Sequence, residues 1–170
     1  MAISGFIKGG SRYSEDPMLA LPGELIEVLM QIPITAAGFT SAAAGDIPLG
    51  SPNPGSGKLV ASGGIPPGNW RIRTDLSRLQ CPAGTATSDL DLGLAAYTKA
   101  DGTSQALQGA LLADSLDVGG GAINQNLSAV APQDVNSLEG IGVVCSFDTA
   151  NSPATGSVTL NLVLQKLPLP

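Results

Sequence analysis

The chain has 170 residues, no histidine, two cysteines and a net charge of -6, and only 13% of its residues are charged. The absence of histidine argues against acid–base or nucleophilic catalysis near neutral pH, which relies on that side chain more than on any other. The negative charge argues against a nucleic-acid partner, whose phosphates it would repel. We therefore expect a structural or binding protein rather than an enzyme, with no cofactor and no metal ion.

The start of the chain shows no targeting pattern. Residues 1–10 lack the basic region followed by a long apolar run that marks a signal peptide. The longest apolar stretches are interrupted well before the roughly 20 residues of a membrane helix. We expect a protein that is made in the cytoplasm and has no membrane partner.

Glycine and proline are abundant, with 22 and 13 residues, while lysine, arginine and glutamate are scarce. This balance favours many short strands joined by turns over helices. The length suits one domain, or one domain with an arm. We expect an arm at residues 1–22 and an all-β domain at residues 23–170.

The arm at residues 1–22 combines glycines and prolines, which interrupt regular structure, with isolated apolar side chains. A purely flexible tail is usually more polar than this. We expect the arm to dock on a partner surface; the alternative is that it packs on its own domain. The residues expected to bind the partner are Ile3, Phe6, Ile7, Arg12, Tyr13, Met18 and Leu19.

The first strand of the domain is predicted at residues 24–35. Ile26, Val28 and Met30 fall on one face, as in a half-buried strand. A helix over residues 23–31 is the competing interpretation. Pro33 permits an edge strand or a strand end, but not a central position in a sheet.

Residues 36–57 are mostly small residues interrupted by prolines. Ile47 and Leu49 alternate around Pro48, which indicates a short edge strand. Residues 51–57 have the composition of a turn or an exposed loop, and a second short strand is plausible at residues 58–62.

Residues 67–102 contain two alternating segments. Pro67-Gly68 predicts a turn, after which apolar and charged residues alternate from Trp70 to Asp75. A second alternating strand is predicted at residues 88–97, and Asp101-Gly102 is a strong hairpin signal. The inward face of the second strand is predicted to carry Leu90, Leu92 and Leu94.

The rest of the chain predicts a short helical segment and then two long strands. Residues 105–113 could form one or two helical turns, although Gly109 weakens them, and the glycines at 119–121 predict a hinge or tight bend. Alternation over residues 140–148 and 157–166 predicts a long hairpin. Together with the earlier short strands, these segments predict an antiparallel β-sandwich.

Few side chains could form a metal, disulfide or ligand-binding site. Cys81 and Cys145 lie outside any zinc-binding pattern, which favours two buried thiols; a disulfide would require neighbouring strands. Asp89 and Asp91 share a strand face, but calcium needs six to eight ligands and no further carboxylates follow at matching spacing. Trp70 together with Arg71 and Arg73 could form a sugar platform, yet the place of Trp70 just after a turn favours a core residue or a plug at the rim of a sheet.

Five segments occur in a recognisable order. They read "IPLG", "GKLVASGGIPPGNWRIRTDLSRL", "SDLDLGLAAYTKADG", the short apolar-rich "ALLADSLDVGG" and, as a final hairpin, "GVVCSFDTANSPATGSVTLNLVLQ". This order resembles the small jelly-roll head-decoration, or cement, proteins of tailed bacteriophages. The resemblance lies in strands and turns, not in a catalytic motif.

The resemblance implies an auxiliary virion protein on the outer surface of the phage head. Such a protein would bind the major capsid protein where capsomers meet, associate with itself as a dimer or trimer, and stabilise the shell without a cofactor. The resemblance does not indicate which individual residues would form the binding site. The alternative is a carbohydrate-binding or receptor-binding jelly-roll module of a tail fibre or spike.

Overall fold

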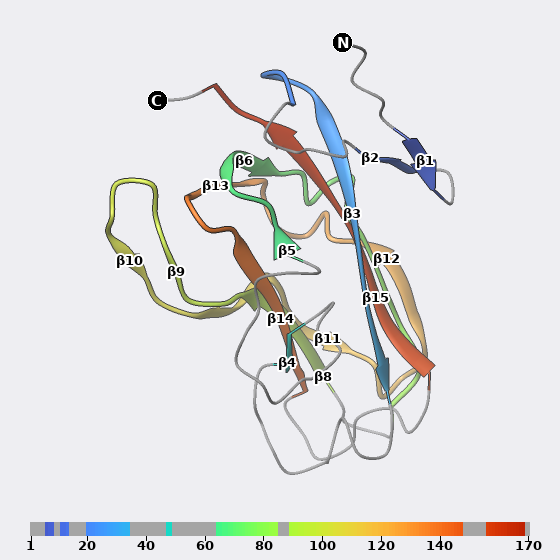
Figure 1. Ribbon diagram of the computed structural model, residues 1–170. Coiled ribbons are helices and arrows are strands. Elements are labelled where there is room, and N and C mark those ends of the chain that lie inside the picture. Colours follow the sequence, from blue (N-terminus) through green and yellow to red (C-terminus); the bar gives the residue numbers. More distant parts are fainter. Residues whose placement is uncertain are drawn as a thin grey trace.

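The computed structural model describes residues 6–8, 11–13, 20–34, 47–48, 64–84, 89–147 and 156–168 (Figure 1). Within these residues all secondary structure is β-strand, and every strand pairing is antiparallel. The predicted all-β class is confirmed. None of the described segments forms a helix with the length and apolar character needed to cross a membrane.

The larger sheet has six strands arranged around the C-terminal strand. That strand pairs on one side with β3, and on the other with β7 and then β6. Strands β12 and β13 extend the sheet beyond β7 and β6. The six strands are β3 (Leu25–Ile34), β6 (Gly68–Ile72), β7 (Arg78–Cys81), β12 (Ile123–Asn126), β13 (Gln133–Ser137) and β15 (Gly156–Lys166).

The smaller sheet has five strands in the order β11-β8-β14-β4, with β5 also paired to β14. They are β4 (Ile47–Pro48), β5 (Gly64–Ile65), β8 (Asp89–Leu94), β11 (Gln108–Asp117) and β14 (Ile141–Phe147). Two separate two-stranded pairs complete the described strands: β1 (Phe6–Lys8) with β2 (Ser11–Tyr13), and β9 (Tyr97–Thr98) with β10 (Ser104–Gln105).

The core lies between the two sheets and makes the fold a β-sandwich. Alternate residues of β8 and β15 point inward from opposite sheets into one buried cluster. The inward side chains Leu90, Leu92, Leu94, Val158, Leu160, Leu162 and Leu164 are fully buried. The face assignments predicted for these two strands are therefore confirmed.

Strand β3 confirms the strand prediction over the competing helix. Ile26 and Met30 are buried, while Leu25 and Leu29 on the other face are exposed. Among the described strands, β3 is hydrogen-bonded only to β15, so it is an edge strand. Pro33 lies near its end, where the missing N–H breaks no central ladder.

The hairpin signal at Asp101-Gly102 is also confirmed. The turn joins β9 to β10, and the Lys99 amide donates to the Thr103 carbonyl at 2.8 Å. Gly102 has a φ of 83°, a backbone conformation that glycine adopts at little cost.

The helical turns predicted at residues 105–113 are wrong. This segment enters β11, which pairs with β8 through irregular register at two points, and Leu112 and Ala113 are buried against the core. Ser115 has a φ of 51°, as expected where a bulge interrupts a strand. The bulges break the two-residue alternation, which is why the sequence pattern did not indicate a strand.

The predicted C-terminal hairpin is wrong as well. Both strands exist, but β14 belongs to the five-stranded sheet and β15 to the six-stranded sheet. Strand β14 is bonded by β8 on one side and by β4 and β5 on the other, so it has no edge left for β15. Short edge strand β4 contains the predicted Ile47 and Pro48, whereas the loop at 51–57 and the strand at 58–62 lie outside the described residues.

Candidate functional site

The residues predicted to bind a partner lie in the arm. Phe6 and Ile7 are in β1, and Arg12 and Tyr13 are in β2; the strand register places Phe6 opposite Tyr13 and Ile7 opposite Arg12. The structure thus adds a short hairpin to a segment in which no regular structure was expected. Three further predicted residues, Ile3, Met18 and Leu19, lie outside the described residues. Partner binding by the arm stays a prediction.

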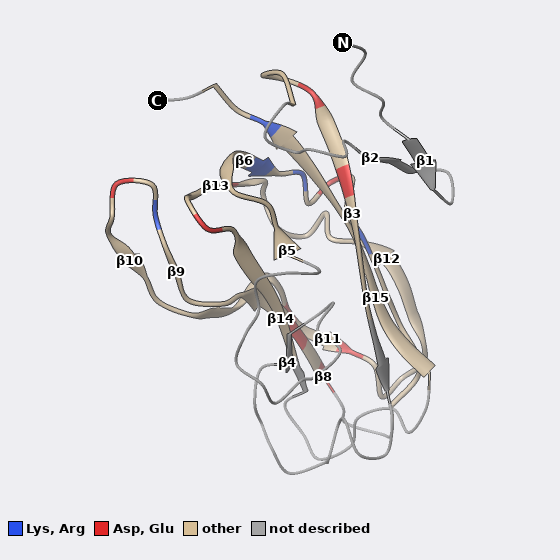
Figure 2. Cartoon of the chain, viewed as in Figure 1, with Lys and Arg blue, Asp and Glu red and all other residues tan. Residues whose placement is uncertain are grey.

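A second candidate surface is the outer face of the six-stranded sheet. Hydrogen-bonded strands place one residue row across this face, in the order Asp134, Arg71, Gln165 and Leu25. Figure 2 shows basic residues in and directly after β6, and acidic residues in and directly before β3. Because Trp70 and Ile72 are buried on the opposite face, Arg71 is held on the outside by strand alternation.

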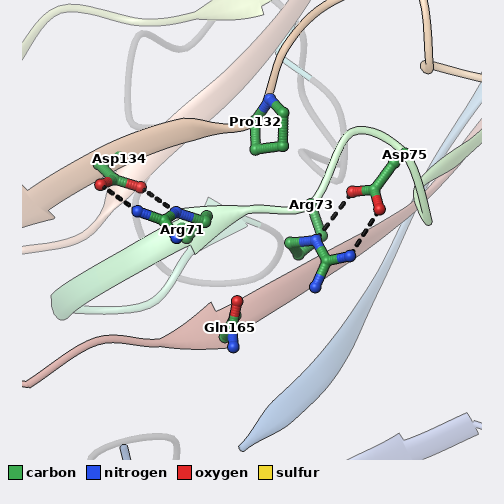
Figure 3. A pocket seen from close by; sticks show the side chains of 6 residues that line it. All are labelled: Arg71, Arg73, Asp75, Pro132, Asp134 and Gln165. Atoms are coloured by element: carbon green, nitrogen blue, oxygen red, sulfur yellow. Dashed lines mark hydrogen bonds and ion pairs between the residues drawn. The ribbon is translucent and has the colours of Figure 1, made fainter. Parts of the chain in front are cut away.

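This face contains a hollow of about 390 Å³ lined by Arg71, Arg73, Asp75, Pro132, Asp134 and Gln165 (Figure 3). Arg71 donates from Nε and Nη2 to the two Asp134 carboxylate oxygens, at 2.6 and 2.9 Å. Arg73 makes the same two-point contact with Asp75, with Nε 2.8 Å from Oδ1. Two guanidinium–carboxylate pairs therefore flank the hollow, each held in a planar geometry.

The turn that carries Arg73 and Asp75 is anchored by buried hydrogen bonds. The Ser77 hydroxyl donates to the Arg73 carbonyl at 2.8 Å and accepts from the Val163 amide of β15 at 2.9 Å. The hydroxyl of buried Thr74 donates to the Val130 carbonyl at 2.6 Å. These bonds tie the turn to the sheet on one side and to the chain before β13 on the other, so the hollow has a rigid frame.

The two pairs remain ionised at neutral pH. Hydrogen bonds from the arginines lower the pKa of Asp134 and of Asp75, and the same bonds raise the pKa of Arg71 and of Arg73. With two cations and two anions, the hollow has balanced charge. It can bind a partner through directional hydrogen bonds and contact with the guanidinium planes, rather than through net attraction.

Trp70 is a core residue, as predicted, and cannot serve as a sugar platform. Its side chain is fully buried, and its indole N–H donates to the Pro67 carbonyl at 3.2 Å. The Lys166 ammonium lies 4.3 Å from the centre of the ring and covers it. No face of the indole is open to a ligand.

The cysteines are buried, and Asp91 is hydrogen-bonded to the backbone of a neighbouring strand. Cys81 in β7 and Cys145 in β14 are buried, as predicted, and their strands belong to different sheets. Burial raises the pKa of the Cys81 thiol to about 12. The Asp91 carboxylate accepts the Ser115 amide at 2.7 Å. Across the described ranges no three His, Cys, Asp or Glu residues gather to hold a metal ion.

The hollow was not predicted from the sequence, although part of the signal was visible. The alternation of Arg71 and Arg73 with the buried Trp70, Ile72 and Thr74 indicates two outward cations, one in β6 and one directly after it. Their carboxylate partners differ in sequence distance. Asp75 is two residues from Arg73, whereas Asp134 is 63 residues from Arg71 and is placed beside it only by the strand register. Comparison with protein families, curated proteins and solved structures found no match.

Proposed function

We propose that this chain is a non-enzymatic structural protein of a tailed-phage virion. It binds the outside of the assembled head and clamps neighbouring subunits of the major capsid protein. The order of strands and turns in the sequence supports this class, and a rigid β-sandwich suits a part that must hold its shape under load. The proposal assigns the protein to the virion surface after synthesis in the host cytoplasm.

The observation that carries the proposal is the framed hollow on the outer face of the six-stranded sheet. Arginine is enriched at protein interfaces, where its planar group makes several contacts at once. In both pairs the arginine contacts its aspartate through Nε and Nη2. The side chains of Arg71 and Asp134 are 43% and 52% exposed, so this pair is accessible to a partner. A capsid surface that offers carbonyl or carboxylate oxygens would complete the hydrogen bonding of these guanidinium groups.

The arm supplies the second contact of the clamp. Its apolar residues Phe6, Ile7 and Tyr13 are joined to the domain through residues 14–19. Two weak contacts on one molecule bind more tightly than either alone, because the first raises the effective concentration of the second. Simultaneous docking of the hollow and the arm on adjacent capsid subunits would therefore hold those subunits together.

Binding to purified, expanded and undecorated phage heads tests both contacts. Arg73→Ala removes one guanidinium from the hollow, and Arg78→Ala is the matched control, since Arg78 also lies outward on the same sheet and contacts Asn124 instead. We expect at least about tenfold weaker head binding for Arg73→Ala, equivalent to loss of about 1.4 kcal/mol, and little change for Arg78→Ala.

Removal of residues 1–19 tests the arm, and the cut precedes Ala20 because that residue is part of the buried core. We expect this truncation to lose head binding and to keep the melting temperature of the domain. Full head binding by both the truncation and Arg73→Ala would contradict the proposal. Specific binding to glycans by the intact protein, without head binding, would instead favour the receptor-binding alternative.

A further inference from the structure

Among the strands that the structure describes, β15 pairs with one edge of β3 and none is hydrogen-bonded to the other edge. The Glu24 carbonyl accepts a hydrogen bond from the Lys166 amide of β15 at 2.8 Å, so this carbonyl points toward β15. Backbone direction alternates along an antiparallel strand. The groups of Ile26, Val28 and Met30 therefore also bond β15, while those of Leu25, Glu27, Leu29 and Gln31 point away from it, toward the free edge.

This edge lacks most of the devices that keep sheet edges from pairing. It is ten residues long and regularly paired to β15 throughout, without a bulge. Its outer side chains include Leu25 and Leu29, which are 44% and 53% exposed, and on the core side Val28 is only half buried. Pro33 removes one N–H from the free edge, but only near the end of the strand. β2 runs close to β3, yet no ladder joins these two described strands.

We propose that this edge pairs with β3 of a second copy, in antiparallel fashion, so that two six-stranded sheets become continuous. The strand is self-complementary when Leu29 lies opposite the second copy's Leu29. In this register Glu27 faces Gln31 on both sides of the two-fold axis, and the amide can donate to the carboxylate. Leu25 faces Pro33, where the ladder ends because proline has no N–H to offer.

Other registers fit the side chains less well. Centring the pair on Glu27 would place two carboxylates directly opposite each other, which is destabilising. Centring it on Val28 would place each Glu27 against Leu29, an apolar partner that offers no hydrogen bond. On the core side, the Leu29 register sets Val28 opposite Met30 and thereby extends the apolar layer from one copy into the other.

Self-association through β3 does not depend on the proposed decoration role, since it is measured on the purified protein without phage heads. Sedimentation equilibrium of the full chain should show a reversible dimer. Leu29→Lys, which brings two like charges together at the axis, should weaken dimerisation by at least about tenfold. Leu138→Lys is the matched control, because Leu138 is similarly exposed and lies in a bend after β13, away from β3.

Cysteine cross-linking tests the register. Leu29→Cys should form a disulfide dimer under mild oxidation, because opposite Cα atoms in such a pair lie about 5.5 Å apart. Leu25→Cys should not, because the two cysteines would be eight residues apart along the strand, or about 27 Å. The buried native cysteines are protected from this chemistry.

Three results would overturn the proposal. The first is a protein that stays monomeric at every accessible concentration, and the second is a dimer that Leu29→Lys leaves unchanged. The third is a monomer that dimerises only after residues 1–19 are removed, because that result would assign the edge to the chain's own arm.

Discussion

The Ser77→Ala substitution removes a single hydroxyl that joins the turn at residues 73–77 to the central strand. That hydroxyl is fully buried, donates to the Arg73 carbonyl and accepts from the Val163 amide. The Arg73 carbonyl keeps two other donors, the amides of Leu76 and Ser77, but Val163 is left with a buried amide and no acceptor on that side. Loss of the bond and of the partner together should cost about 2–4 kcal/mol in the free energy of unfolding.

Chemical denaturation and thermal melting measure this cost directly. For a chain of this length each kcal/mol corresponds to roughly 2–4 °C in melting temperature, so we expect a decrease of roughly 4–16 °C. Ser104→Ala is the control, since Ser104 is an exposed strand residue and its substitution should change stability by less than about 0.5 kcal/mol. A Ser77→Ala protein as stable as the wild type would refute the view that this hydroxyl anchors the turn.

Three further predictions concern other parts of the fold. Gly93→Ala should unfold or severely destabilise the domain, because a Cβ atom there would lie 1.9 Å from the Gln108 carbonyl oxygen. In the control Gly102→Ala the new Cβ atom meets no neighbouring atom, so the cost should be only about 1–2 kcal/mol of backbone strain. Differential scanning calorimetry of both variants measures the difference. Cys81, whose pKa is raised to about 12 by burial, should resist iodoacetamide at pH 8 in the native protein and react once the protein is denatured, and rapid native labelling would contradict its burial. Arg71 lowers the pKa of Asp134, so the pair stabilises the fold above the usual pKa near 3.8 and its contribution disappears as the pH falls through the folded-state value. Asp134→Asn should therefore lose less than about 1 kcal/mol at pH 7 and match the wild type in strong acid, in denaturation curves measured across pH.

Regular strands with one buried face were predictable from the sequence. In β15 the buried residues Val158, Leu160 and Leu162 alternate with partly exposed ones, and β8 follows the same rule. Pro33 correctly restricted β3 to an edge or a strand end, since its missing N–H would break a central ladder. These features depend on residues that are close in sequence, so local pattern was enough to indicate them.

Features that depend on which strands are neighbours were not predictable in this way. Alternation assigns each residue to a face but does not identify the adjacent strand, so β14 and β15 were expected as one hairpin although they belong to different sheets. The bulges of β11 hid a strand because they shift residues such as Ser115 out of phase. The Arg71–Asp134 pair depends on the β6–β13 register, which no local pattern contains.

Co-sedimentation with expanded, undecorated phage heads tests the central claim most directly. The purified protein would be titrated onto the heads, and the bound copies counted at saturation. We expect saturable binding at a constant copy number per capsomer, with weaker binding for Arg73→Ala and for the chain that lacks residues 1–19. Absence of saturable binding to the heads, for a protein shown to be folded, would contradict it.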